Sequence, residues 1–345
     1  MRPPLAETAF AFEGRIVAIG QVVLAALRWG EWNDLERAVR TGLVGVQCAE
    51  RDDSSFADAE LRPILIAWRR ERQLLAAEDY QAWLAERGLT LEDMSAYLRR
   101  SAVAELTADG VCDPAALAAV VYPEAILDGR LRAWAQRLAQ HEGARRALRA
   151  RGDETPPMLA EEVSELVAAA KRADASGLDE IPVERLRVWA VEVLELEQAW
   201  SLLADQVGHD EAIERCLSAH RLDWPRLEWE EATFAREDVA REAALWVRDE
   251  GMELSAVAEQ AGTVSTVEAA YGYEVRETAH MLTGKRPGEL VGPIATGSGW
   301  RLVLLRERVL PVAADPQLRA RAIDELLDDA LAPHLAGRVE WHARL

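Results

Sequence analysis

Apolar residues recur at three- and four-residue spacing through the first half of the chain, from Leu5 to about Asp174. Leu61, Ile64 and Trp68 are one example of this spacing. An apolar stripe with this period is typical of amphipathic helices, because it lines one side of a turn of 3.6 residues. The pattern therefore predicts that helices dominate this region.

Three polar or proline-containing breaks interrupt the helical pattern, at Asp52–Ser55, Asp109–Pro114 and Arg151–Pro157. A long helix from about Ile126 is expected to end at the third break, where two prolines follow one another. That break is a candidate linker. A further helix is expected over Pro182–Ala204, which opens with proline at an early position.

The pattern changes after Trp224. Two short helices are predicted, over Glu237–Asp249 and Leu254–Ala261, among β-branched and aromatic runs. Two of those runs, Leu290–Ile294 and Trp300–Val309, flank a glycine-containing connection and predict a β-hairpin.

The second arm of this hairpin carries apolar residues on both faces at Leu302–Leu305, which predicts a central strand covered on both sides. The chain then returns to a helical pattern from about Asp315 to His334. Strands are therefore expected only between about Leu227 and Val309.

The most apolar segment, Ile16–Leu27, is too short to span a bilayer, and Glu7 and Glu13 precede it where a targeting signal would be basic. It is expected to be a buried first helix, and no membrane partner is expected. Sixty acidic residues against 40 basic ones give a net charge of -20, which repels phosphate backbones and anionic lipids. Nucleic acid is therefore not an expected partner either.

The side chains that usually hold metals show no ligand spacing along the chain. Cys48, Cys112 and Cys216 are far apart with no Cys-x-x-Cys pair, and the six histidines include no His-x-x-x-His. No metal, cofactor or disulfide framework is predicted. The cysteine usage fits a reducing cytoplasm.

A specific run of residues, Pro287–Ile294 followed by Gly299–Leu305, resembles the C-terminal hairpin of parvulin-type (PpiC) peptidyl-prolyl isomerases. Upstream, Leu227–Phe234 resembles the first strand of that domain, and Glu237–Asp249 and Met252–Gly262 resemble the two helices that follow. The resemblance implies a parvulin-like α+β domain in this part of the chain.

The helix-rich part before it resembles the chaperone module of SurA-like proteins, notably at Glu60–Leu74 and Trp83–Thr90, as does the C-terminal helix with its Trp341-His342 ending. The expected fold class is mainly α with a smaller α+β domain. The expected segments are a SurA-like helical module (1–150), a second helical region (151–223), a reduced parvulin-like domain (224–312) and a C-terminal helix that packs back on the module (313–345).

The chain departs from the parvulin pattern at its two active-site histidines, which fall on Glu231 and Arg301. The stretch between Gly262 and Pro287 is also too short for the family's pocket residues, of which Met281 is interpreted as a remnant. Prolyl isomerisation has a torsional barrier of about 18–20 kcal/mol, and its catalyst must hold the proline ring and favour the twisted amide. The departures imply a pseudoenzyme that has lost this activity.

Two interpretations of the replaced histidines stay open. Glu231 and Arg301 pair with each other across neighbouring strands, or Arg301 binds a peptide carboxylate or acidic side chain through two hydrogen bonds. Trp300 is adjacent to Arg301 and must point to the opposite face of the strand. The candidate peptide-binding residues are Arg301, Glu231, Met281, Trp300, Trp29 and Trp32.

The chain is expected to be a non-catalytic, cytoplasmic peptide-binding accessory protein. The resemblance extends to parvulin-related proteins encoded beside enzymes that mature ribosomally made peptides, so the expected ligand is a precursor peptide in the biosynthesis of a ribosomal peptide natural product (RiPP). The alternatives are an active parvulin-type isomerase and a scaffold for a maturation enzyme.

Overall fold

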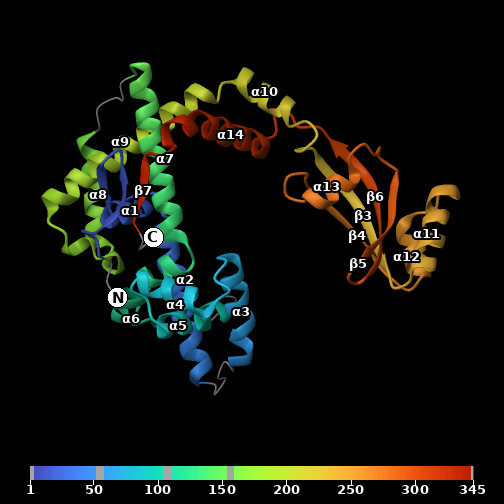
Figure 1. Cartoon of the computed structure of the whole chain (residues 1–345), viewed down its shortest axis with the longest axis horizontal. Helices are drawn as coiled ribbons and strands as arrows, with labels where there is room; N and C mark the ends of the chain where they lie inside the picture. The colour runs from blue at the N-terminus through green and yellow to red at the C-terminus, as the bar shows by residue number, and fades with distance from the viewer. Residues whose placement is uncertain (1–3, 52–57, 104–109, 154–158, 343–344) are drawn as a thin grey trace. The chain divides into compact units, whose positions relative to one another are not determined.

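The computed structural model describes residues 4–51, 58–103, 110–153, 159–342 and 345 (Figure 1). The chain divides into two compact units, the first comprising residues 1–203 and 329–345 and the second residues 204–328. The expected segment boundaries at 150/151, 223/224 and 312/313 lie inside these units.

Helices build most of the first unit, as the apolar spacing predicted. They are α1 (Ile19–Arg28), α2 (Glu31–Arg51), α3 (Asp58–Glu71), α4 (Ala77–Glu86), α5 (Leu91–Ala102), α6 (Pro114–Leu127), α7 (Arg130–Arg151), α8 (Ala160–Arg172), the short 3₁₀ helices η1 (Asp174–Ser176) and η2 (Leu178–Glu180), and α9 (Val183–Val207). The single helix expected from Ile126 to the third break is instead the end of α6 and all of α7, because Gly129 takes a φ of 84° between them.

Side-chain caps fix where several of these helices begin. Before α5, the Thr90 hydroxyl accepts a hydrogen bond from the Asp93 amide at 3.1 Å, and the Asp93 carboxylate accepts one from the Thr90 amide at 2.8 Å. At α6, Asp113 accepts from the Ala115 amide at 3.1 Å and Pro114 takes the first helical position. Such caps satisfy amides that have no partner within the helix.

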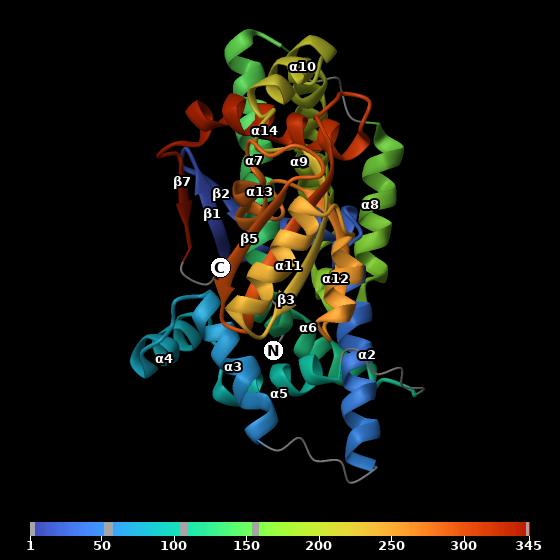
Figure 2. The ribbon, with the colours of Figure 1, turned by 90° about the vertical axis from the view of Figure 1, so that its right-hand side faces the viewer.

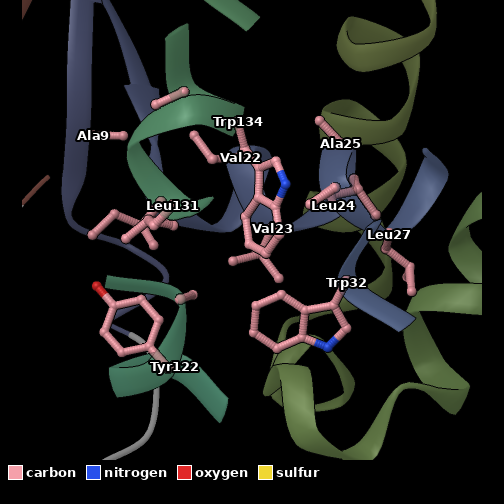
Figure 3. Packing of buried hydrophobic residues seen from close by; sticks show 14 of the residues in the cluster. Ala9, Val22, Val23, Leu24, Ala25, Leu27, Trp32, Tyr122, Leu131 and Trp134 are labelled. Atoms are coloured by element: carbon pink, nitrogen blue, oxygen red, sulfur yellow. The ribbon is translucent and has the colours of Figure 1, made fainter. Parts of the chain in front are cut away.

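Helix α1 lies at the centre of the first unit, with every residue from Ile19 to Leu27 buried. Trp32, Tyr122 and Trp134 pack close to it (Figure 3). The prediction of a buried first helix is confirmed, but the helix begins at Ile19 rather than Ile16, because the residues before Ile19 form a strand.

A small antiparallel sheet also belongs to the first unit. It consists of β1 (Thr8–Phe12), β2 (Arg15–Ala18) and β7 (Val339–Trp341) in the order β2-β1-β7 (Figure 2). The turn between β1 and β2 is Glu13-Gly14, with φ of 49° and 83°, as two-residue hairpin turns require.

The expectation that strands lie only between about Leu227 and Val309 is therefore wrong. Strands β1 and β2 are only a few residues long, so they contain too little alternation to separate them from the helical pattern that follows. Their third partner, β7, comes from a distant part of the chain, and such pairing leaves no local signal.

The second unit contains a four-stranded antiparallel sheet in the order β4-β3-β6-β5. Its elements are α10 (Asp210–Ala219), β3 (Arg226–Phe234), α11 (Glu237–Asp249), α12 (Leu254–Gln260), β4 (Ser265–Tyr271), α13 (Arg276–Leu282), β5 (Leu290–Thr296), β6 (Gly299–Val309) and the first part of α14 (Pro316–Leu335). The expected order of a strand, two helices and a hairpin is confirmed. Strand β4 and helix α13 were not predicted.

Strand β6 is central and is covered on both faces, as its sequence predicted. Leu302 and Leu304 pack in one apolar cluster with α11 and α12, whereas Val303 and Leu305 pack in another that includes Leu282 of α13. The two sets of helices lie on opposite sides of the sheet (Figure 1). The chain is thus mainly α with a smaller α+β unit.

The last turns of α14 belong to the first unit, where Leu331 and Leu335 lie against Gly143 of α7. Across the described residues, no helix combines the length and the apolar run needed to cross a membrane.

Candidate functional site

The candidate site lies on the face of the four-stranded sheet that α13 covers, which we call the α13 face. Strand alternation places the odd-numbered residues of β3 and, as far as Leu305, those of β6 on this face. A bulge then shifts the alternation of β6 by one residue, so Arg308 lies here and donates to the Leu282 carbonyl of α13. Leu227, Trp229 and Val303 form its apolar part with Leu282 of α13. Because Thr233 pairs with Arg301 and Glu231 pairs with Val303, the Glu231 and Arg301 side chains lie diagonally on the same face.

Arg301 has charged and polar neighbours but no close partner. Its Nη1 lies 3.6 Å from Glu231 Oε2, its Nη2 lies 3.8 Å from Glu277 Oε1, and the same Nη2 lies 3.6 Å from Met281 Sδ. Strong charge-assisted hydrogen bonds are about 2.7–2.9 Å long. The guanidinium is therefore attracted by two carboxylates without forming a short bond to either.

The guanidinium is also largely enclosed. The Arg301 side chain is 18% exposed, and its Nε is buried with no hydrogen-bond partner among the described residues. A buried donor without an acceptor is unfavourable, by about 1–3 kcal/mol. Arg301 can therefore donate more hydrogen bonds than it makes here.

Glu231 is held in place by a core residue. The indole N–H of Trp229 donates to Glu231 Oε2 at 3.1 Å, and Trp229 is 2% exposed. The pairing of Glu231 with Arg301 across neighbouring strands, one of the two open interpretations, is present as a long ion pair. By contrast, the Glu277 side chain is 89% exposed and is not held by the core.

The structure brings three of the predicted residues together, namely Arg301, Glu231 and Met281. Trp300 lies on the opposite face of β6, half-buried against the cluster that includes α11 and α12. The strand alternation predicted this separation.

Trp29 and Trp32 belong to the first unit and are not part of this group. Trp32 is 0% exposed and packs against Trp134 at a ring separation of 5.9 Å. The expectation that Trp32 contacts a ligand is therefore corrected, because it is a core residue with no exposed surface. Trp29 is half-buried, with the Arg137 guanidinium 4.1 Å above its ring and His141 against it.

Sequence reasoning missed Glu277 and Trp229. Glu277 and Met281 are four residues apart on α13, and this spacing puts both on one side of a helix turn. The signal was thus in the sequence, but α13 itself was not predicted. Trp229 was not identified because its role depends on a hydrogen bond to the next residue but one.

The sheet has one edge that is open to another strand. Among the described residues β4 pairs only with β3, and Val267 on β4 is 61% exposed. At the other edge, Arg248 donates to the carbonyls of Leu290 and Gly292 of β5 and so occupies part of that edge. An extended peptide would meet fewer obstacles at β4.

The group suits binding of an anion rather than proton transfer. Arg301 is a permanent cation with donors to spare, and guanidinium recognises carboxylate through two parallel hydrogen bonds. Within the part of the chain that the structure describes, the side-chain contacts of Arg301 are to Glu231, Glu277 and Met281, and none is to a histidine or cysteine.

No family model matches the sequence, and no curated protein matches it. Among solved structures, the crystal structure of PrsA from Bacillus subtilis is similar at 14% identity, covering 62% of this chain and 87% of that chain with a TM-score of 0.20. At this identity and TM-score the likeness supports no conclusion about activity.

Proposed function

We propose that this protein is a non-catalytic, chaperone-like accessory protein that binds an extended peptide on the α13 face. The observation that carries the proposal is the Arg301 guanidinium, which is 18% exposed, has a buried Nε–H without an acceptor, and makes only long contacts to Glu231 and Glu277. A peptide carboxylate supplies short acceptors to the two Nη groups, which make only long contacts in the unbound protein.

Binding requires little rearrangement of the site. Glu277 is exposed and lies 3.8 Å from the guanidinium, so an incoming carboxylate displaces it into water at small cost. Glu231 stays in place because Trp229 holds it. The Met281 thioether beside Arg301 offers a flexible apolar contact to the neighbouring peptide side chain.

The main chain of the peptide has its own place to bind. The outer edge of β4 offers backbone donors and acceptors, and addition of a strand to such an edge is a common mode of peptide recognition. Because β4 and β3 separate this edge from β6, the added strand lies about three strand spacings, roughly 14 Å, from the strand that carries Arg301. One segment of the peptide therefore supplies affinity through main-chain hydrogen bonds at β4, and another supplies selectivity through the charge at Arg301.

The proposal includes the absence of turnover. The resemblance to parvulins places two imidazoles where this chain has Glu231 and Arg301. A pocket that binds a proline ring must be apolar, and an ion pair in it does not stabilise the bound ring. In its most specific form the protein is a cytoplasmic partner of a precursor peptide in RiPP biosynthesis, which rests on the resemblance alone.

The test is fluorescence anisotropy with the full-length chain and two labelled, unstructured peptides of the same sequence, one with a free C-terminal carboxylate and one amidated. Arg301→Ala should weaken binding of the carboxylate peptide by about 1.5–3 kcal/mol, roughly 10- to 150-fold, and change binding of the amidated peptide little. Arg241→Ala is the matched control, because Arg241 is a 68% exposed arginine on α11, on the other side of the sheet.

Equal effects of the two arginine variants would contradict the proposed site. A protease-free assay of prolyl cis/trans exchange tests the absence of turnover. Acceleration that disappears in Arg301→Ala would establish an active isomerase instead. No binding of either peptide, together with tight binding of a maturation enzyme, would favour the scaffold.

A further inference from the structure

A separate cluster of metal-binding side chains lies in the second unit, at the end of α10. Cys216 and His220 are four residues apart at its C-terminal end, so they share one side of the helix. Glu325 of α14 faces them, and its carboxylate lies 2.5 Å from His220 Nε2. One donor atom from each of the three residues lies within 4.8 Å of the other two.

We infer that Cys216, His220 and Glu325 form a binding site for a zinc ion. A thiolate, an imidazole and a carboxylate are the donor types that zinc takes in proteins, and the thiolate disfavours magnesium and calcium. This donor set contains no second acidic residue, so it is not a general cluster of negative charge.

The spacing of the donors suits a tetrahedral ion. Zinc bonds of about 2.0–2.3 Å separate neighbouring donors in a tetrahedron by roughly 3.3–3.7 Å. The cluster spans up to 4.8 Å, and the His220 and Glu325 atoms lie 2.5 Å apart. Binding therefore needs the thiol to approach and the His220–Glu325 contact to open by about 0.8 Å, which side-chain rotation supplies.

The surroundings hold two of the ligands in place. The His220 ring stacks on the Trp224 ring at a centroid distance of 4.2 Å and an angle of 11°, and Trp224 is 3% exposed. Cys216 is 9% exposed within an apolar cluster that includes Ile213 and Leu318. A metal allows a thiol in such surroundings to be deprotonated without leaving an uncompensated charge.

The third side of the cluster opens on a cavity of about 480 Å³ that His220 and Glu325 line. Three protein ligands leave a fourth tetrahedral position, which a water or ligand in the adjoining cavity can fill. Zinc sites with an open position bind water or a substrate there, whereas structural sites are closed by four protein ligands. Arg276 and Arg321 also line the cavity, so the fourth ligand is a water or an anionic oxygen.

This inference goes beyond the proposed function and uses none of the residues around Arg301. Zinc binding and peptide binding can therefore succeed or fail separately.

The test begins with full-length protein stripped by a chelator and then titrated with zinc against a chromophoric competitor. One zinc ion per chain is expected. Loss of a residue that only supports a metal ligand lowers metal affinity by about 10- to 100-fold. Cys216 and Glu325 are direct ligands in this inference, so Cys216→Ser and Glu325→Gln should each weaken zinc binding by at least about 100-fold. The matched controls Cys112→Ser and Glu214→Gln should bind as the wild type does, since Glu214 is exposed on α10.

Cobalt(II) provides a direct readout of the thiolate. The cobalt-substituted protein should show sulfur-to-cobalt charge-transfer absorption that Cys216→Ser removes and Cys112→Ser keeps. Circular dichroism of the metal-free variants checks that they fold, and zinc should raise the melting temperature of the wild type but not of Cys216→Ser or Glu325→Gln. Absence of zinc binding, or zinc binding that persists in both ligand variants, would overturn the inference.

Discussion

Acidification should destabilise the first unit through one buried histidine. His141 on α7 is 1% exposed, and its ring stacks on Trp200 at 4.9 Å and meets the edge of Trp29 at 5.5 Å. Neither ring nitrogen has a hydrogen-bond partner among the described residues. Burial, with a further contribution from the charge of Arg137, lowers the pKa of His141 from 6.5 to about 3.

The direction of the effect follows from this lowered pKa. In the unfolded chain His141 takes up a proton near pH 6.5, whereas in the folded chain it stays neutral until about pH 3. The stability that neutral His141 contributes is therefore fully present above pH 6.5 and is lost as the pH falls toward 3. At about pH 5 the loss amounts to about 2 kcal/mol, since each pH unit below the unfolded pKa contributes about 1.4 kcal/mol.

The assay is urea unfolding at about pH 8 and about pH 5. His141→Phe keeps a flat ring between Trp200 and Trp29 but has no titrating group. The free energy of unfolding of the wild type should fall by about 2 kcal/mol more than that of the variant between the two pH values. All other titrating groups are common to both proteins, so the same pH dependence in both would refute the buried neutral histidine.

Three further predictions concern packing and charge. Trp300→Ala should lower stability by about 2–3 kcal/mol in a thermal melt, less than the roughly 3–5 kcal/mol of a fully buried indole, because Trp300 is half-buried; a change in peptide affinity instead would contradict its place on the opposite face. Gly20→Ala should cost about 1–3 kcal/mol in urea unfolding, because the added Cβ would lie 2.4 Å from the Trp189 ring, and wild-type stability would contradict that contact. Arg100→Met should lower the free energy of unfolding by about 3–5 kcal/mol, because it leaves the Glu124 carboxylate, which is only 11% exposed, without its ion-pair partner. Burial already raises the pKa of this carboxyl. The double variant Arg100→Met/Glu124→Leu should recover much of this loss. Equal stability of the single and double variants would contradict the explanation that the unpaired Glu124 carboxylate causes the loss.

Local patterns were sufficient to predict the long elements of this fold. Helix α9 was predicted from its early proline, and β6 from apolar residues on both faces. Strand β4 was missed because most of its residues are exposed, so it has no alternation of buried and exposed positions. Strands β1 and β2 were missed because the pairing that completes their sheet comes from β7, far away in the sequence.

The site was predictable to the extent that strand geometry determines it. Alternation along β6 separates Trp300 from Arg301 whatever the rest of the chain does. The ion pair of Arg301 with Glu231 required the pairing of β3 with β6, which the resemblance supplied. Glu277 required α13, whose seven residues are too few to show a helical period.

The proposed zinc site also depends on contacts between residues that are far apart in the sequence. The spacing of Cys216 and His220 is visible in the sequence, although it was not recognised as a ligand pattern. Glu325 follows His220 by 105 residues, and only the packing of α14 against α10 brings it there. No local pattern contains that information.

The pairing of β1 with β7 has a consequence for the order in which the chain folds during synthesis. Residues 204–328 form the second unit from one continuous stretch, so all of its contacts are available before the last residues emerge from the ribosome. The first unit must wait, because Phe10 pairs with Trp341 and the two rings lie 5.3 Å apart. Closing so long a loop is slow, and until it closes β1 presents an unpaired edge beside an apolar core. A released chain truncated after residue 328 should therefore hold a folded second unit and a first unit that other strands can still invade.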